Sequence, residues 1–90
     1  MADPFHRLHQ RHFRLIASVA RLGQISQAAE HLAMTQPAAS RMLAEIERLV
    51  EAPVFERHPK GMRPTPMGEA LARHAGILLS RIDEAAKEIQ

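Results

Sequence analysis

Hydrophobic positions in the first quarter of the chain recur at the three- and four-residue spacing of an amphipathic helix. Gly23 interrupts this pattern, because glycine readily takes the left-handed conformation that ends a helix. The pattern predicts a first helix over residues 6–22. The predicted buried residues are Leu8, Phe13, Ile16, Ala17, Val19 and Ala20, and the predicted outer residues are Arg7, Arg11, Arg14 and Arg21. Exposed arginines on a helix are usually only solvated, so these stay outside the predicted site.

A second helix and the start of a third are predicted within residues 26–41, which read SQAAEHLAMTQPAASR. Ser26 can cap the first of these helices, and Thr35 can cap the next, with Pro37 in its first turn. This spacing leaves room for one short helix and a three-residue turn. Two helices joined so tightly cross steeply, and the start of the second protrudes. The segment therefore predicts a helix-turn-helix whose second helix can enter a major groove.

The helix that follows Thr35 has two faces of different chemistry. On the polar face, Gln can pair with adenine, Arg can pair with guanine, and Pro and Ala surfaces suit a thymine methyl group. The alternative is a solvated face, which any amphipathic helix needs. The predicted core face comprises Ala39, Met42, Leu43, Ile46, Leu49 and Val50, and the other stripe comprises Gln36, Pro37, Ser40, Arg41 and Ala44, of which Gln36, Pro37, Ser40 and Arg41 are the predicted base-reading residues.

Two short extended segments flank the turn-rich residues 58–61, a pattern that predicts a β-hairpin. Arg57, Lys60 and Arg63 lie in a run, 57–63, that contains no acidic residue. The hairpin is therefore predicted to be a basic wing that meets phosphates or a minor groove, and Ser26 and Thr35 are predicted to contact the backbone with it. A merely solvated hairpin tip is the alternative.

A long last helix is predicted from Thr65 and Pro66, since Thr suits the cap and Pro the first helical position. The apolar residues after them are spaced by four and three, as in a coiled-coil seam, over about 36 Å at 1.5 Å per residue. One small domain cannot cover this seam, so its outer part is predicted to pack on a second copy; a helix lying wholly on its own core is the alternative. The seam, whose residues are the predicted dimer interface, comprises Leu71, Ala75, Leu78, Ile82, Ala85 and Ile89. It is still running where the chain ends, which suggests a fragment of a larger protein.

Composition indicates one small soluble module with an aliphatic core. The 90 residues are 46% hydrophobic and include no Cys, Trp or Tyr, so Phe5, Phe13 and Phe55 are the only aromatic core candidates. A disulfide or Cys-based zinc site is excluded, which fits a reducing cytoplasm. Neither a membrane-spanning apolar run nor a signal-peptide core at residues 1–7 is present, and the prediction is a cytoplasmic protein. The net charge of +2 is only a weak indicator of nucleic-acid binding.

Several motifs together resemble the N-terminal DNA-binding domain of LysR-type transcriptional regulators. They are AAEHL at 28–32, TQPAASR at 35–41, VFER at 54–57 and RPTPMGE at 63–69. The resemblance covers nearly the whole chain and implies a mainly α winged helix-turn-helix, with a three-helix core and a short two-stranded wing over 1–65 and a dimerising linker helix over 66–90. It also implies a downstream domain that senses a small-molecule effector and often brings dimers together as tetramers. A two-fold dimer requires an interrupted palindrome in double-stranded promoter DNA.

Two residues depart from the family pattern. Glu51 stands where the family usually has a Gly in a left-handed turn, and a positive φ there would cost about 1 kcal/mol or more. Pro64 stands where an aliphatic strand residue is usual, and because Pro cannot donate to a ladder, the wing should be short.

The sequence offers little support for functions other than DNA binding. His6, His9 and His12 have helical spacing, but only Asp3 adds a carboxylate nearby, and His6 and His12 diverge, so neither a metal site nor any other cofactor is expected. No motif of an enzyme is present. A protein-binding adaptor would expose an apolar patch on the recognition helix, and a nonspecific architectural DNA binder would carry more lysine.

Overall fold

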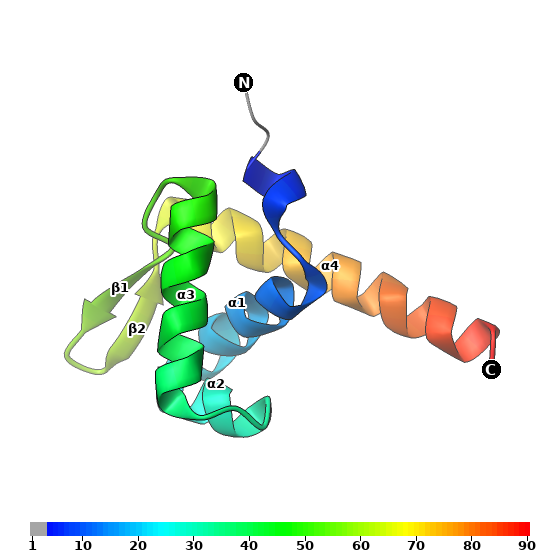
Figure 1. Cartoon of the computed structure of the whole chain (residues 1–90), viewed down its shortest axis with the longest axis horizontal. Helices are drawn as coiled ribbons and strands as arrows, with labels where there is room; N and C mark the ends of the chain where they lie inside the picture. The colour runs from blue at the N-terminus through cyan, green and yellow to red at the C-terminus, as the bar shows by residue number, and fades with distance from the viewer. Residues whose placement is uncertain (1–3) are drawn as a thin grey trace.

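The computed structural model describes residues 4–90 and is mostly helical (Figure 1). Asp3 and the rest of the segment 1–3 lie outside the described residues. In chain order the elements are η1 (Pro4–Arg7), α1 (Gln10–Leu22), α2 (Ile25–His31), α3 (Gln36–Val50), β1 (Phe55–His58), β2 (Gly61–Pro64) and α4 (Pro66–Glu88). Three helices form the core, the hairpin lies beside α3, and α4 extends away from the body. The predicted fold class is confirmed.

The predicted first helix over 6–22 is wrong at its start. Residues 4–7 form a separate 3-10 turn, and α1 begins only at Gln10. The reason is a local cap, since the His9 N–H donates to Nδ1 of His12 at 2.9 Å. In a helix that began at residue 6, this N–H would instead bond a backbone carbonyl of the preceding turn. Gly23 ends the helix with φ 76°, as its sequence predicted.

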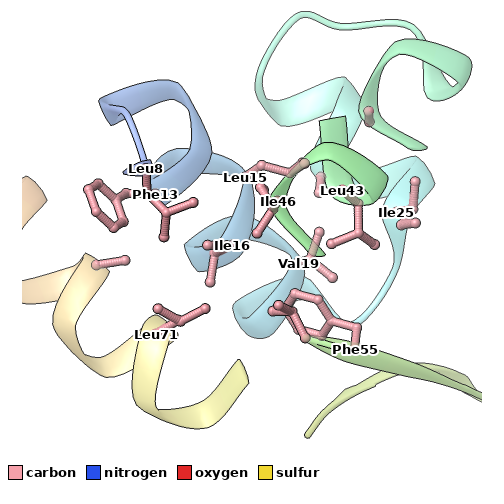
Figure 2. Packing of buried hydrophobic residues seen from close by; sticks show 14 of the residues in the cluster. Leu8, Phe13, Leu15, Ile16, Val19, Ile25, Leu43, Ile46, Phe55 and Leu71 are labelled. Carbon is pink, nitrogen blue, oxygen red and sulfur yellow. The ribbon is translucent and has the colours of Figure 1, made fainter. Parts of the chain in front are cut away.

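The core gathers apolar residues from every helix and from β1 (Figure 2). Leu15, Ile16 and Val19 of α1 are completely buried, and so is Ile46 of α3. Leu15 was missing from the predicted set, although it lies directly before Ile16 and Ala17, which were included. Phe13 and Phe55 are buried, and the half-buried ring of Phe5 packs on Phe13 with 5.2 Å between ring centroids.

The first turns of α4 pack tightly against the segment that leads into the wing. Thr65 caps α4 by accepting from the Gly68 N–H, and it donates its hydroxyl to the Pro53 carbonyl at 2.7 Å. A Cβ on Gly68 would lie 1.9 Å from the Val54 carbonyl oxygen, so only glycine allows this approach. These contacts fix the direction in which α4 leaves the domain.

The wing is a short antiparallel hairpin, as Pro64 predicted. Its register pairs Phe55 with Pro64 and His58 with Gly61. At its base, a Glu47 carboxylate oxygen accepts from the Val54 N–H at 2.8 Å and so connects the hairpin to α3.

Glu51 has φ 56°, the left-handed conformation expected if it replaces a glycine. Its N–H bonds the Glu47 carbonyl, so the backbone closes α3 as a glycine would. No helix within residues 4–90 is long and apolar enough to span a membrane.

Candidate nucleic-acid interface

The helix-turn-helix is built from α2, α3 and the residues 32–35 between them, one more than the three-residue turn that was predicted. The Met34 N–H bonds the Ala29 carbonyl at 2.8 Å, and Ala33 takes a positive φ of 56°. Buried Ala28 and Ala29 let α3 approach α2 closely. The turn thus directs the start of α3 outward.

The two predicted caps have different outcomes. The Thr35 hydroxyl accepts from the Ala38 N–H at 3.2 Å, which confirms the cap of α3, and Pro37 lies in the first turn. Ser26 does not cap α2, because the helix begins at Ile25 and its cap position is Gln24. Burial of Ile25 draws that residue into the helix and leaves Ser26 exposed within the first turn.

The two faces of α3 separate as the sequence indicated. Ala39, Leu43, Ile46 and Val50 are buried, and Met42 and Leu49 pack partly against the core. Every member of the other stripe is exposed: Gln36, Pro37, Ser40, Arg41 and Ala44. A band of hydrogen-bonding side chains interrupted by small surfaces therefore faces solvent along the first half of α3.

The hairpin register divides the predicted basic residues between two faces of the wing. Partners across an antiparallel ribbon share a face, and neighbours along a strand alternate. Arg57 pairs with Met62 and shares its face with buried Phe55, whereas Arg63 pairs with Glu56 on the opposite face. Arg63 there donates to Nε2 of His58 at 2.6 Å. The predicted set of Arg57, Lys60 and Arg63 is thus not one continuous patch.

A surface groove of about 300 Å³ lies between the wing and the starts of α2 and α3. Its lining brings together four predicted site residues from distant parts of the sequence: Ser26, Gln36, Arg57 and, at the wing tip, Lys60. Ser40 and Arg57 line a second, adjoining depression. Arg57 therefore borders the α3 stripe directly, a position that only the register reveals.

Gln24 is a groove residue that the sequence reasoning missed. Its side chain lines the same groove and donates from Nε2 to the Lys60 carbonyl at 3.3 Å. The sequence signal that was available is its position directly after Gly23, in the turn between two predicted helices.

Glu45 and His12 form a pair behind α3, away from the groove. Nε2 of buried His12 lies 2.5 Å from Oε2 of Glu45, and Arg11 is 3.9 Å from the same oxygen. Because Nδ1 of His12 accepts the His9 amide, Nε2 carries the proton and donates to the carboxylate. The hydrogen bond from His12 is the largest influence on Glu45 and lowers the pKa of its carboxyl below the ordinary 4.5, against the opposing effect of burial.

This pairing also bears on the histidines considered as metal ligands. Both ring nitrogens of His12 already have protein partners, so neither offers a lone pair to a metal. Within residues 4–90, no three His, Cys, Asp or Glu side chains gather closely enough to hold an ion.

The predicted seam on α4 divides at its middle. Leu71 and Ala75 are buried in the core of their own domain at 7% and 0% exposure, so their assignment to a dimer interface is wrong. The reason is that the first half of α4 packs along α1. Leu78 and Ile82 are 38% and 39% exposed, and Ala85 and Ile89 are exposed as well. The structure adds Ile77, at 55% exposure, to this outer apolar surface.

These elements define a winged helix-turn-helix domain. The sequence model of the family described as bacterial regulatory helix-turn-helix proteins, lysR family, matches residues 10–69. The chain belongs to this family.

Relatives and solved structures agree with that assignment. The chain is 44% identical over 80 residues to the HTH-type transcriptional regulator GbpR of Rhizobium radiobacter, covering 87% of this chain and 26% of GbpR. It is 37% identical over 83 residues to GbpR of Azospirillum brasilense, covering 92% of this chain and 24% of that protein. The crystal structure of the BenM DBD in complex with catB site 1 DNA superposes with a TM-score of 0.86 at 27% identity, covering 91% of each chain. The chain spans about a quarter of the length of these curated relatives.

Proposed function

We propose that this domain binds double-stranded DNA sequence-specifically as a homodimer, with α3 in the major groove and the wing at the adjacent minor groove and backbone. The observation that carries the proposal is the exposed stripe of α3, bordered by Arg57 across the groove. Gln36, Ser40 and Arg41 present amide, hydroxyl and guanidinium groups, which match base edges in the major groove, and Pro37 offers an apolar surface for a thymine methyl group. The BenM DBD, which has the same fold, is in complex with DNA in its crystal structure, and this supports DNA as the partner of the domain.

The remaining contacts are assigned by their position around the groove. Ser26, Thr35, Arg57 and Lys60 lie where phosphates flanking the recognition helix would pass. Arg63 faces away from α3 and would meet the backbone from the outer side of the wing. Such contacts fix the register of the protein on DNA and carry little sequence information.

The dimer is assigned to the outer half of α4. Leu78, Ile82, Ala85 and Ile89 form an apolar surface that their own domain leaves uncovered. Residues 1–65 then act as the reading unit and 66–90 as the dimerisation helix. Two copies related by a two-fold axis require an interrupted palindrome as their site.

The complete regulator is proposed to act as a cytoplasmic transcription factor without catalytic activity. A further domain would bind a small-molecule effector and assemble dimers into tetramers. The relatives are named transcriptional regulators, which supports the regulatory role, and they are about four times longer than this chain, which supports a further domain.

Selection of binding sites from a random duplex pool tests the proposal. The purified domain should enrich an interrupted palindrome, and its affinity should fall steeply with salt because cations on the protein displace counterions. The control carries Gln36→Ala, Ser40→Ala and Arg41→Ala together, and it should bind DNA without enriching the motif. Absence of any enriched sequence with the unsubstituted domain at two salt concentrations would reject sequence-specific recognition and favour an adaptor role.

A further inference from the structure

The tip of the wing is hydrogen-bonded to the turn between α1 and α2. The Met62 N–H donates to the Gly23 carbonyl oxygen at 2.7 Å. Nearby, Nε2 of Gln24 donates to the Lys60 carbonyl at 3.3 Å. We call the contacts among Gly23, Gln24 and residues 60–62 the wing clamp. They hold one side of the hairpin tip, while Glu47 and Thr65 hold its base.

Gly61 shows how closely the clamp is packed. It has φ 135°, a conformation that other residues rarely adopt. A Cβ at this position would lie 2.2 Å from the Gly23 carbonyl oxygen and 3.4 Å from Nε2 of Gln24. The hairpin can therefore occupy this place only with glycine at 61.

The Gln24 side chain bonds the wing instead of capping α2. Gln24 occupies the cap position of α2, where Ser, Thr, Asp or Asn would bond an orphan amide. No such side-chain bond is present, and the amide reaches the hairpin instead. A residue that favoured the stability of α2 would be too short to reach Lys60.

We infer that Gln24 is a positioning residue for DNA binding: through the Lys60 carbonyl it sets the distance between the wing tip and the start of the recognition helix. Lys60 and Gln36 lie on opposite sides of the groove that Gln24 lines. A fixed spacing between them lets the phosphate contact and the base contact form together without further ordering of the hairpin. This inference rests on the proposed function.

Three variants separate positioning from stability. Gln24→Met keeps the length of the side chain and removes the amide donor. Gln24→Ser replaces the amide with a hydroxyl that is too short to reach the Lys60 carbonyl and is a better cap for α2. Gln27→Met is the matched control, because Gln27 is exposed on the same helix and lies outside the groove lining. We expect both Gln24 variants to bind the selected operator roughly 2- to 10-fold more weakly, the effect of one lost hydrogen bond, and Gln27→Met to bind as the unsubstituted domain does. Gln24→Ser should bind more weakly although its unfolding midpoint is unchanged or higher. A purely structural role of Gln24 would instead lower the unfolding midpoint together with the affinity.

A double-mutant cycle with Lys60→Ala tests whether Gln24 acts through the wing tip. Lys60→Ala retains the carbonyl that Gln24 holds but removes the ammonium group that the clamp would place. In this background Gln24→Met should cost less than about 2-fold, because coupled residues are not additive. Additive losses would show that Gln24 touches DNA by itself, and equal affinity of Gln24→Met and the unsubstituted domain would show that the clamp has no part in binding. Either result overturns the inference.

A measurement on the free domain distinguishes this inference from the proposed function. Amide hydrogen exchange at Met62 reports the bond to Gly23 and requires no DNA. Gln24→Met should accelerate this exchange relative to Gln27→Met, and unchanged exchange would overturn the clamp even if the domain binds its operator tightly. Faster exchange in a domain that selects no DNA would reject the proposed function and the positioning role with it, while the clamp contacts would stand.

Discussion

The exposed stripe of α3 and the outer half of α4 are both left uncovered by their own chain, yet their chemistry is opposite. The stripe presents amide, hydroxyl and guanidinium groups from Gln36, Ser40 and Arg41. The end of α4 presents branched aliphatic side chains, including Ile82 at 39% and Ile89 at 84% exposure. Polar groups remain well solvated until a partner replaces water bond for bond, whereas apolar groups gain free energy whenever they leave water. The chemistry of the first surface therefore supports the proposed reading of base edges, and that of the second supports the proposed dimer.

The comparison also shows that exposure alone does not identify a partner. The stripe lies on a helix whose other side is buried in the core, whereas the outer half of α4 lies beyond the buried first half of its helix. The two surfaces can be altered separately, because neither set of side chains belongs to the buried core.

The largest effect is expected from a charge placed on the outer half of α4. Leu78→Glu should convert dimers to monomers and weaken operator binding by about 100-fold or more, since two linked reading heads gain affinity from each other. Sedimentation and operator titration measure the two consequences. Ser80→Glu adds the same charge to an exposed position of α4 away from the seam and should leave both unchanged. Persistent dimers in Leu78→Glu would place the interface elsewhere.

A smaller loss is expected when one donor is removed from α3. Arg41→Ala should cost about 1–3 kcal/mol of binding free energy and relax the preference at one position in each half-site. Repeating the site selection with this variant gives the preference directly. Arg48→Ala removes an exposed arginine near the other end of α3 and should leave the preference intact. If Arg41→Ala selects the unaltered motif, Arg41 does not read a base.

A change at the end of α3, away from the two surfaces, should alter stability without affecting the binding of either proposed partner. Glu51→Gly should raise the free energy of unfolding by about 1 kcal/mol, because glycine adopts φ 56° without the steric cost of a Cβ. Glu51→Ala keeps that cost and removes only the charge. Urea unfolding should rank Gly above Ala and Glu, and equal midpoints would mean that the left-handed turn carries no strain.

The smallest effect concerns pH and the pair behind α3. Since the hydrogen bond from His12 lowers the pKa of Glu45, the charged carboxylate stabilises the folded state above its ordinary pKa of 4.5. This stabilisation is lost as the pH falls through the lowered value. Thermal unfolding of Glu45→Gln should therefore depend less on pH below 4.5 than that of the unsubstituted domain. Parallel curves would show that the pair adds no pH dependence.

The helix starts that could be predicted from the sequence are those set by residues within one turn of the chain. Thr35 and Thr65 each cap a helix with a hydroxyl, and Pro37 and Pro66 lie in the first turns, because these preferences act within one turn of chain. Where two local signals competed, the prediction failed. Ser26 is a good cap by type, but burial of Ile25 moved the start of α2 earlier. His6 and Arg7 continue a helical pattern, but the His9 amide bonds His12 and starts α1 later.

The sequence by itself determined the order of elements, the polar and apolar faces of α3 and the short hairpin, since spacing, caps and turn residues are read along the chain. Only the tertiary structure decided which residues from distant parts of the chain contact one another. It placed Arg57 beside α3 and turned Arg63 away, buried Leu71 and Ala75 within the domain, and joined Gln24 to the wing tip. These outcomes depend on strand register and on how helices pack, and both are set by distances between segments that one-dimensional periodicity does not contain.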